Sequence, residues 1–134
     1  MDGGKVIMAN IIFKDGLIYT DATLTHGSKN VIIKNALIDT GSSSTVISSE
    51  IAHKLGLKPE ANDLINSVQG VGGSESVYEK KIDSIKFDVS AASNFHIQVG
   101  AMDYGIELEA IIGLDLLIKC SAILDLNNFI LTTL

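Results

Sequence analysis

Mostly apolar segments separated by short turn signals dominate the first third of the chain. Residues 5–14 and 17–25 are rich in β-branched side chains, and Asp15-Gly16 between them is a strong signal for a two-residue hairpin turn. Residues 31–38 form a mostly apolar run that is typical of a buried strand. This run ends at Asp39, so an ionisable side chain is predicted directly after a buried strand.

The rest of the chain predicts one early helix and more short strands. Ser48 or Ser49 can cap the helix, and Gly56 can end it. Further strands are predicted at 64–69, 75–82, 85–89, 95–101, 110–112, 122–126 and 129–134, with a second short helix at 114–119. These elements predict a mainly β domain over residues 1–134, closed or sandwich-like, with one or two short helices.

Composition and charge narrow the function classes. A chain of 134 residues with 46% hydrophobic residues can bury a core, and its net charge of −6 argues against nucleic acid or an anionic membrane as a partner. No stretch reaches the roughly 18 consecutive apolar residues of a membrane span, and the N-terminus lacks the features of a signal peptide. The single cysteine, Cys120, cannot form an intramolecular disulfide, so a cytoplasmic protein is expected.

The chemistry centres on Asp39-Thr40-Gly41, which by itself also fits an ordinary turn. An acid after a buried strand is costly unless its charge is solvated or shared. Two other segments follow in order: the glycine-rich stretch 70–73 between two predicted strands, and Ile111-Ile112-Gly113, with Leu116-Leu117 just after it. Each segment is weak evidence alone, and the combination is more specific.

Together these segments resemble the retropepsins, the retroviral-type aspartic proteases, over about residues 31–126. Residues 37–41 followed by Thr45-Val46 resemble the active-site loop, and 70–73 resembles the tip of the flap, a hairpin at about 64–82. Residues 111–113 resemble the apolar strand and glycine before the last helix of that fold. The resemblance implies a closed, β-barrel-like acid protease fold that is completed as a twofold dimer.

The implied activity is hydrolysis of peptide bonds by a water activated between two carboxylates that share one proton. The sequence holds one Asp-Thr-Gly and no convincing internal repeat, so the second carboxylate is expected from another copy in a homodimer. In the implied catalytic loop, Asp39 acts on the water. Thr40 hydrogen-bonds across the axis, and Gly41 lets the substrate backbone approach. A peptide or protein substrate is expected, without metal or cofactor.

Several substrate-binding roles follow from the resemblance. The backbone N–H of Val71 would hold a water that bridges to the substrate, and glycines around it would let the flap open. Glu107 and Glu109 fall in a stretch that forms a cleft wall in the family, where they favour basic substrate residues or are simply solvated. The resemblance also implies substrate-binding roles for Gly70, Gly72, Gly73, Ser42 and Ser43. It implies the same role for Leu37, Val46 and Ile111, which fit a core equally well.

The chain departs from the viral pattern at several positions. Ser42 replaces an alanine, and its hydroxyl could donate to Asp39 and favour the ionised form, which predicts an acid-shifted optimum. Leu114 replaces an arginine, and Ser43-Ser44 replace acids, so dimer contacts are expected to be built differently, through Asp115 or the terminal strands. Those apolar ends either interleave across the dimer or pair within one subunit.

Other function classes have less support. One alternative keeps the fold but makes the chain a dimerisation or peptide-binding module with little turnover, and another is a structural β-domain with a chance motif. His26, His53 and His96 lack metal-ligand spacing, and Cys120 lacks a basic or histidine neighbour that would activate it. These residues therefore suggest no competing chemistry.

Overall fold

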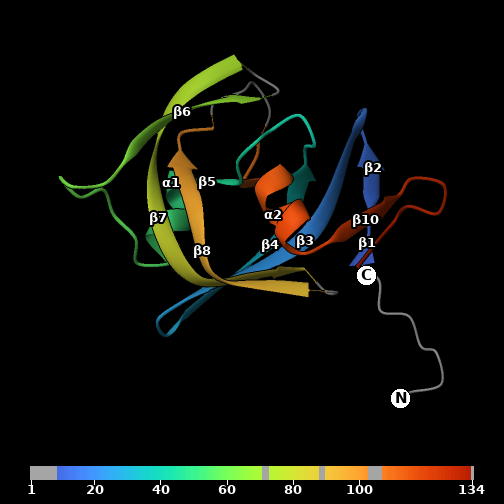
Figure 1. Cartoon of the computed structure of the whole chain (residues 1–134), viewed down its shortest axis with the longest axis horizontal. Helices are drawn as coiled ribbons and strands as arrows, with labels where there is room; N and C mark the ends of the chain where they lie inside the picture. Colours follow the sequence, from blue (N-terminus) through green and yellow to red (C-terminus); the bar gives the residue numbers. More distant parts are fainter. Residues whose placement is uncertain (1–8, 71–72, 88–89, 103–106, 134) are drawn as a thin grey trace.

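The computed structural model describes residues 9–70, 73–87, 90–102 and 107–133 (Figure 1). Two residues of the expected flap tip, Val71 and Gly72, lie outside these ranges, and so do residues 5–8 of the first expected strand. The elements in chain order are β1 (Ala9–Asn10), β2 (Ile12–Lys14), β3 (Leu17–His26), β4 (Lys29–Ile38), β5 (Val46–Ser48), α1 (Ser49–Lys54), β6 (Ile65–Gly70), β7 (Gly73–Phe87), β8 (Ser90–Gly100), β9 (Ala110–Ile112), α2 (Leu114–Lys119), β10 (Ala122–Asp125) and β11 (Ile130–Thr133).

One large sheet closes into a ring. Its strand order is β2-β3-β4-β9-β5-β8-β7-β6, and β3 also pairs with β7, so the sheet returns on itself. The long strands β7 and β8 curve strongly, and α1 packs beside β8 (Figure 1). The predicted mainly β, barrel-like fold with two short helices is confirmed. None of the helices within the described residues is long and apolar enough to cross a bilayer.

Local signals account for the early turn and the first helix. Lys14 pairs with Leu17 across a two-residue loop in which Asp15 and Gly16 have φ of 52° and 80°, the conformation that Asp-Gly favours in hairpins. Ser48 caps α1 by accepting from the Ile51 amide at 3.2 Å, and Gly56 follows its end with φ of 77°. The predicted hairpin and helix are therefore confirmed.

The described ends of the chain pair with each other. In a second, three-stranded sheet of order β1-β11-β10, Ala9 lies opposite Leu131, and the Ile11 amide donates to the Phe129 carbonyl at 2.9 Å. The chain then leaves this sheet, and β2 joins β3 instead, so the single strand expected at 5–14 is interrupted at Ile11. The described ends therefore pair with each other within this one chain, and interleaving across a dimer stays a prediction.

Three central strands separate two apolar clusters. Neighbouring residues of a strand point to opposite faces. Accordingly, Ile38, Ile47 and Ile112 belong to the larger cluster. The residues that precede them, Leu37, Val46 and Ile111, belong to the smaller cluster. Burial on both faces explains why the last three residues of β4, the first two of β5 and all of β9 are apolar. The smaller cluster consists of Leu37, Val46, Val68, Val77, Met102, Leu108 and Ile111.

Candidate active site

The loop that carries Asp39 continues the pairing of β4 with β9. These strands run parallel, with Leu37 opposite Ile111 and Ile38 opposite Ile112. The Asp39 amide then donates to the Ile112 carbonyl at 2.9 Å, one residue beyond the end of β4. The position of Asp39 is therefore fixed by the buried strand that precedes it and by the strand beside it.

The two carboxylate oxygens of Asp39 have different surroundings. Oδ1 accepts from the Gly41 amide at 2.9 Å, while the Asp39 carbonyl accepts from the Ser42 amide at 3.1 Å. Oδ2 is buried and has no hydrogen-bond partner among the residues that the structure describes. Because an unpartnered buried carboxylate oxygen is costly, this atom is suited to a donor from outside the described chain.

Gly41 leaves room for this carboxylate. A Cβ at position 41 would lie 3.2 Å from Asp39 Oδ1, closer than ordinary van der Waals contact. Thr40, between the two, is exposed. The turn therefore directs the Asp39 amide inward and presents Thr40 at the surface.

The start of α2 anchors the other side of the loop. Thr45 donates to Asp115 from its hydroxyl at 2.7 Å and from its amide at 3.1 Å, and Thr45 Oγ1 accepts from the Gly113 amide at 3.1 Å. The Leu114 amide donates to the Ser42 carbonyl at 2.8 Å. These contacts join segments about 70 residues apart in sequence into one rigid site.

Gly113 is required by close packing at this junction. A Cβ there would lie 2.5 Å from the Ser44 carbonyl oxygen and 2.9 Å from that of Ser42. Backbone atoms cannot move aside as the end of a long side chain can, so only glycine fits. Asp115, one of the two alternatives for a dimer contact, accepts from Thr45 of its own chain with both oxygens, and Oδ1 also accepts from the Leu116 amide at 2.8 Å.

Comparison with known proteins decides the family. The family profile described as aspartyl protease matches residues 22–116, which include the Asp39 loop and Gly113. The chain belongs to the aspartyl protease family. A crystal structure of a retropepsin-like aspartic protease from Rickettsia conorii matches 96% of this chain and 92% of its own, with a TM-score of 0.68 and 20% sequence identity. That similarity shows a retropepsin-like fold. No curated protein sequence matches the chain.

Ser42 does not make the contact expected of it in this aspartyl protease-family loop. The side chain is 3% exposed, and its hydroxyl donates to the Ser44 carbonyl at 2.8 Å. A hydroxyl has one proton to donate, so Oγ does not donate to Asp39. The expectation of an acid-shifted pH optimum therefore loses its physical basis. The Ser42 side chain instead makes a hydrogen bond that stabilises the loop, here called the Ser42 brace.

This brace gives a testable prediction for Ser42→Ala. We expect the pH–rate profile of peptide hydrolysis to overlay that of the parent, since no contact to the carboxylate is lost. The free energy of unfolding should fall by about 1 kcal/mol because one buried hydrogen bond is removed. Steady-state rates across pH give the profile, and denaturant unfolding gives the free energy. A profile that moves by a full pH unit would contradict this role for Ser42.

The apolar residues expected to line the cleft lie in the core. Leu37, Val46 and Ile111 are only 1–2% exposed and pack together in the smaller cluster. Val68 of β6 and Val77 of β7 cover the same cluster. The structure therefore buries these three side chains within this one chain, and their role in substrate binding stays a prediction.

The hairpin expected to form the flap is present in its described part. Strands β6 and β7 pair from Ile65 opposite Tyr78 to Gly70 opposite Gly73. The flap hairpin was expected to end at about residue 82, but its second strand, β7, continues to Phe87. Ser43, the remaining expected substrate contact, is exposed beside the Asp39 loop.

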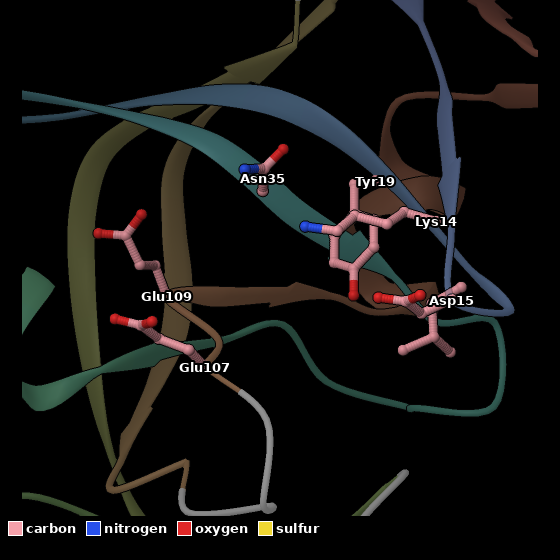
Figure 2. Close-up of a pocket in the computed structure, with 7 residues that line it drawn as sticks. Lys14, Asp15, Tyr19, Asn35, Glu107 and Glu109 are labelled. Carbon is pink, nitrogen blue, oxygen red and sulfur yellow. The ribbon is translucent and has the colours of Figure 1, made fainter.

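A pocket of about 440 Å³ includes Asn35 of β4, the strand that leads into the Asp39 loop (Figure 2). Asn35 is four residues before Asp39, so their Cα atoms are at most about 13 Å apart along an extended chain. Figure 2 shows Glu107 and Glu109 on one side of the pocket and Tyr19 on the other. The lining residues are Lys14, Asp15, Leu17, Tyr19, Asn35, Glu107 and Glu109.

Metal chemistry has no support in the described part of the chain. There, no three His, Cys, Asp or Glu side chains gather in an arrangement that could hold an ion. His96 Nδ1 lies 3.2 Å from Glu79 Oε2 on β7. His26 Nδ1 lies 3.7 Å from Asp83 Oδ1 on β7 and has no hydrogen-bond partner among the described residues. Cys120 is buried.

Proposed function

We propose that this aspartyl protease-family chain is an endopeptidase that cleaves peptide bonds with a water activated between the Asp39 carboxylates of two copies. The observation that carries the proposal is the buried Asp39 Oδ2, which has no hydrogen-bond partner among the described residues although Oδ1 is held by Gly41. A carboxylate held on one oxygen and unpartnered on the other is suited to share a proton and a water with a second acid.

The proposed reaction uses the two acids in opposite roles. Two carboxylates about 3 Å apart cannot both ionise easily, so the pair holds one proton. The ionised acid takes a proton from the water, which attacks the peptide carbonyl carbon, while the protonated acid donates to the carbonyl oxygen. When the tetrahedral intermediate collapses, the C–N bond breaks, the acid that took the water proton gives it to the leaving amine, and the other acid takes a proton from a hydroxyl of the intermediate. The acids then return to their starting state.

The second acid is proposed to come from another copy. The 134 residues contain one Asp-Thr-Gly, and their fold matches nearly the whole length of the Rickettsia conorii chain. The exposed Thr40 is next to Asp39, so two facing Asp39 loops would also bring the Thr40 hydroxyls together across the axis. Gly41, with its missing side chain, would leave space for the substrate backbone.

The flap is proposed to cover an extended substrate. Strands β6 and β7 supply a paired hairpin, and the glycines at positions 70, 72 and 73 would let it open and close. In this proposal the Val71 amide holds a water that bridges to substrate carbonyls. Closing would exclude bulk water and strengthen the electrostatic contacts around the two carboxylates.

An assay distinguishes this function from the alternative peptide-binding module. The parent protein is incubated with a mixed peptide library between pH 4 and 7, and new peptide ends are identified by mass spectrometry. Internal cleavage that depends on Asp39 supports the endopeptidase. Peptide binding with no cleavage at any of these pH values would favour the binding module.

The Figure 2 pocket gives a prediction about specificity. Its lining has three acids, Asp15, Glu107 and Glu109, against one base, Lys14, so it should favour a basic substrate side chain. We expect Glu107→Gln/Glu109→Gln to lower kcat/KM about five-fold for a substrate with lysine or arginine at the residue that reaches the pocket. For a matched substrate with glutamine at that residue, the double variant and the parent should have the same kcat/KM.

The control for this prediction is Glu50→Gln, which removes one exposed acid from α1, half the charge that the double variant removes. It should leave both rates unchanged. Equal losses for the two substrates in the double variant would show that Glu107 and Glu109 do not select charge.

A further inference from the structure

An uncharged pocket lies directly beside the Asp39 loop. Its volume is about 260 Å³, and it lies where Thr40 approaches α2 and β10. Figure 1 shows α2 and β10 as neighbours in space. The described lining residues are Thr40, Leu114, Leu117, Ile118, Ser121, Ala122 and Leu124.

The α2 side of this pocket exposes large apolar side chains. Leu114 is 38% exposed and Ile118 is 71% exposed, and residues four apart on a helix lie on the same face. No ionisable side chain belongs to the described lining, in contrast to the pockets lined by Glu109, by His96 and by Asp21. In a chain of net charge −6, such an uncharged apolar face is suited to association.

The position of Thr40 determines which partner fits this face. If two Asp39 carboxylates meet on a twofold axis, the adjacent Thr40 and the pocket that it lines must lie beside that axis and face the second copy. A twofold contact brings a surface against its own copy, so a surface of one charge would repel itself, whereas an uncharged apolar surface does not. The nearest acid on α2, Asp115, is held by Thr45 of its own chain.

We propose that the apolar face formed by Leu114 and Ile118 beside Thr40 is covered by a second copy of this chain, and that its burial holds the two Asp39 loops together. The proposal rests on the proposed function, because the dimer that completes the site gives the face its partner. It makes the contact next to the catalytic acids apolar rather than ionic. The dimer should therefore be as tight at 500 mM NaCl as at 50 mM, or tighter, since salt screens the repulsion between two acidic chains.

The test is Ile118→Asp, measured by sedimentation velocity over a range of protein concentrations. We expect the dimer dissociation constant to rise at least about 100-fold, because an apolar contact is lost and a carboxylate is placed in the interface. Peptidase activity should fall at low protein concentration and recover as the concentration rises. Ile118→Ala, which adds no charge, should raise the dissociation constant about 10-fold.

The matched control is Ile32→Asp. Ile32 is 62% exposed on β4, seven residues before Asp39, and its replacement adds the same charge far from the proposed contact. This variant should dimerise like the parent. Circular dichroism of all variants checks that the monomer remains folded.

The outcomes separate this inference from the proposed function. An active parental dimer whose dissociation constant is unchanged by Ile118→Asp, or which dissociates as salt rises, would overturn the apolar contact and leave the endopeptidase intact. A parent that stays monomeric and inactive at all concentrations would overturn both.

Discussion

Replacement of Asp39 by asparagine is expected to lower peptide hydrolysis by at least about 10⁴-fold, because the dimer then loses both its general base and its general acid. Asparagine has nearly the same shape, and its side-chain oxygen can still accept from the Gly41 amide that now bonds to Oδ1 at 2.9 Å. The fold and the dimer should therefore persist. Initial rates on one cleaved peptide, measured for parent and variant at equal concentration, check the loss.

The control is Asp21→Asn, which alters a half-buried acid of β3 whose Oδ2 lies 3.7 Å from Lys34 Nζ. It should cleave at the parent rate. Mixing gives a second check: when parent and Asp39→Asn chains are refolded together, activity should fall as the square of the parent fraction, because only dimers with two aspartates are active. A linear fall would mean that each chain works alone.

Replacement of Gly113 by alanine is expected to cost about 3 kcal/mol of the free energy of unfolding, a large effect for one methyl group. The backbone at Gly113 has φ of −96°, which alanine adopts without strain. The cost comes from the Cβ, which would lie 2.5 Å from the Ser44 carbonyl oxygen and push the loop away from α2. Denaturant unfolding at one fixed protein concentration measures it, since the stability of a dimer depends on concentration.

Gly41→Ala is the informative comparison. Its Cβ would meet only Asp39 Oδ1, at 3.2 Å, so the stability loss should stay below about 1 kcal/mol. Activity should nevertheless fall about 100-fold, because the carboxylate is displaced from its working position. If Gly113→Ala is as stable as Gly41→Ala, then the junction between the loop and α2 is looser than the structure indicates.

The features that could be predicted from the sequence have causes within a few residues of each other. Asp15-Gly16 specifies a hairpin, and Ser48 and Gly56 delimit α1, because each acts on its own backbone or on that of close neighbours. The Asp39 loop was identified by its motif together with two distant segments in the right order. The fold class follows from the number and spacing of the apolar runs.

The features that could not be predicted depend on contacts between distant segments. Nothing local indicates that Asp115 accepts from Thr45, 70 residues earlier, or that the Ser42 hydroxyl turns toward Ser44 instead of Asp39. The break at Ile11 arises because β1 and β2 join different sheets. The residue type of Leu37 fits a cleft or a core equally well. Its burial depends on packing against Val68 of β6 and Val77 of β7, which are distant in sequence.

The most direct test of the two-chain active site is a crystal structure of the dimer, read for one distance. The Asp39 carboxylates of the two copies should face each other across a twofold axis, with oxygen atoms about 3 Å apart and a water bound between them. The same crystal structure would show whether Leu114 and Ile118 are covered by the second copy. A dimer in which the Asp39 side chains point to separate surfaces, beyond the reach of one shared proton, would contradict the proposed site.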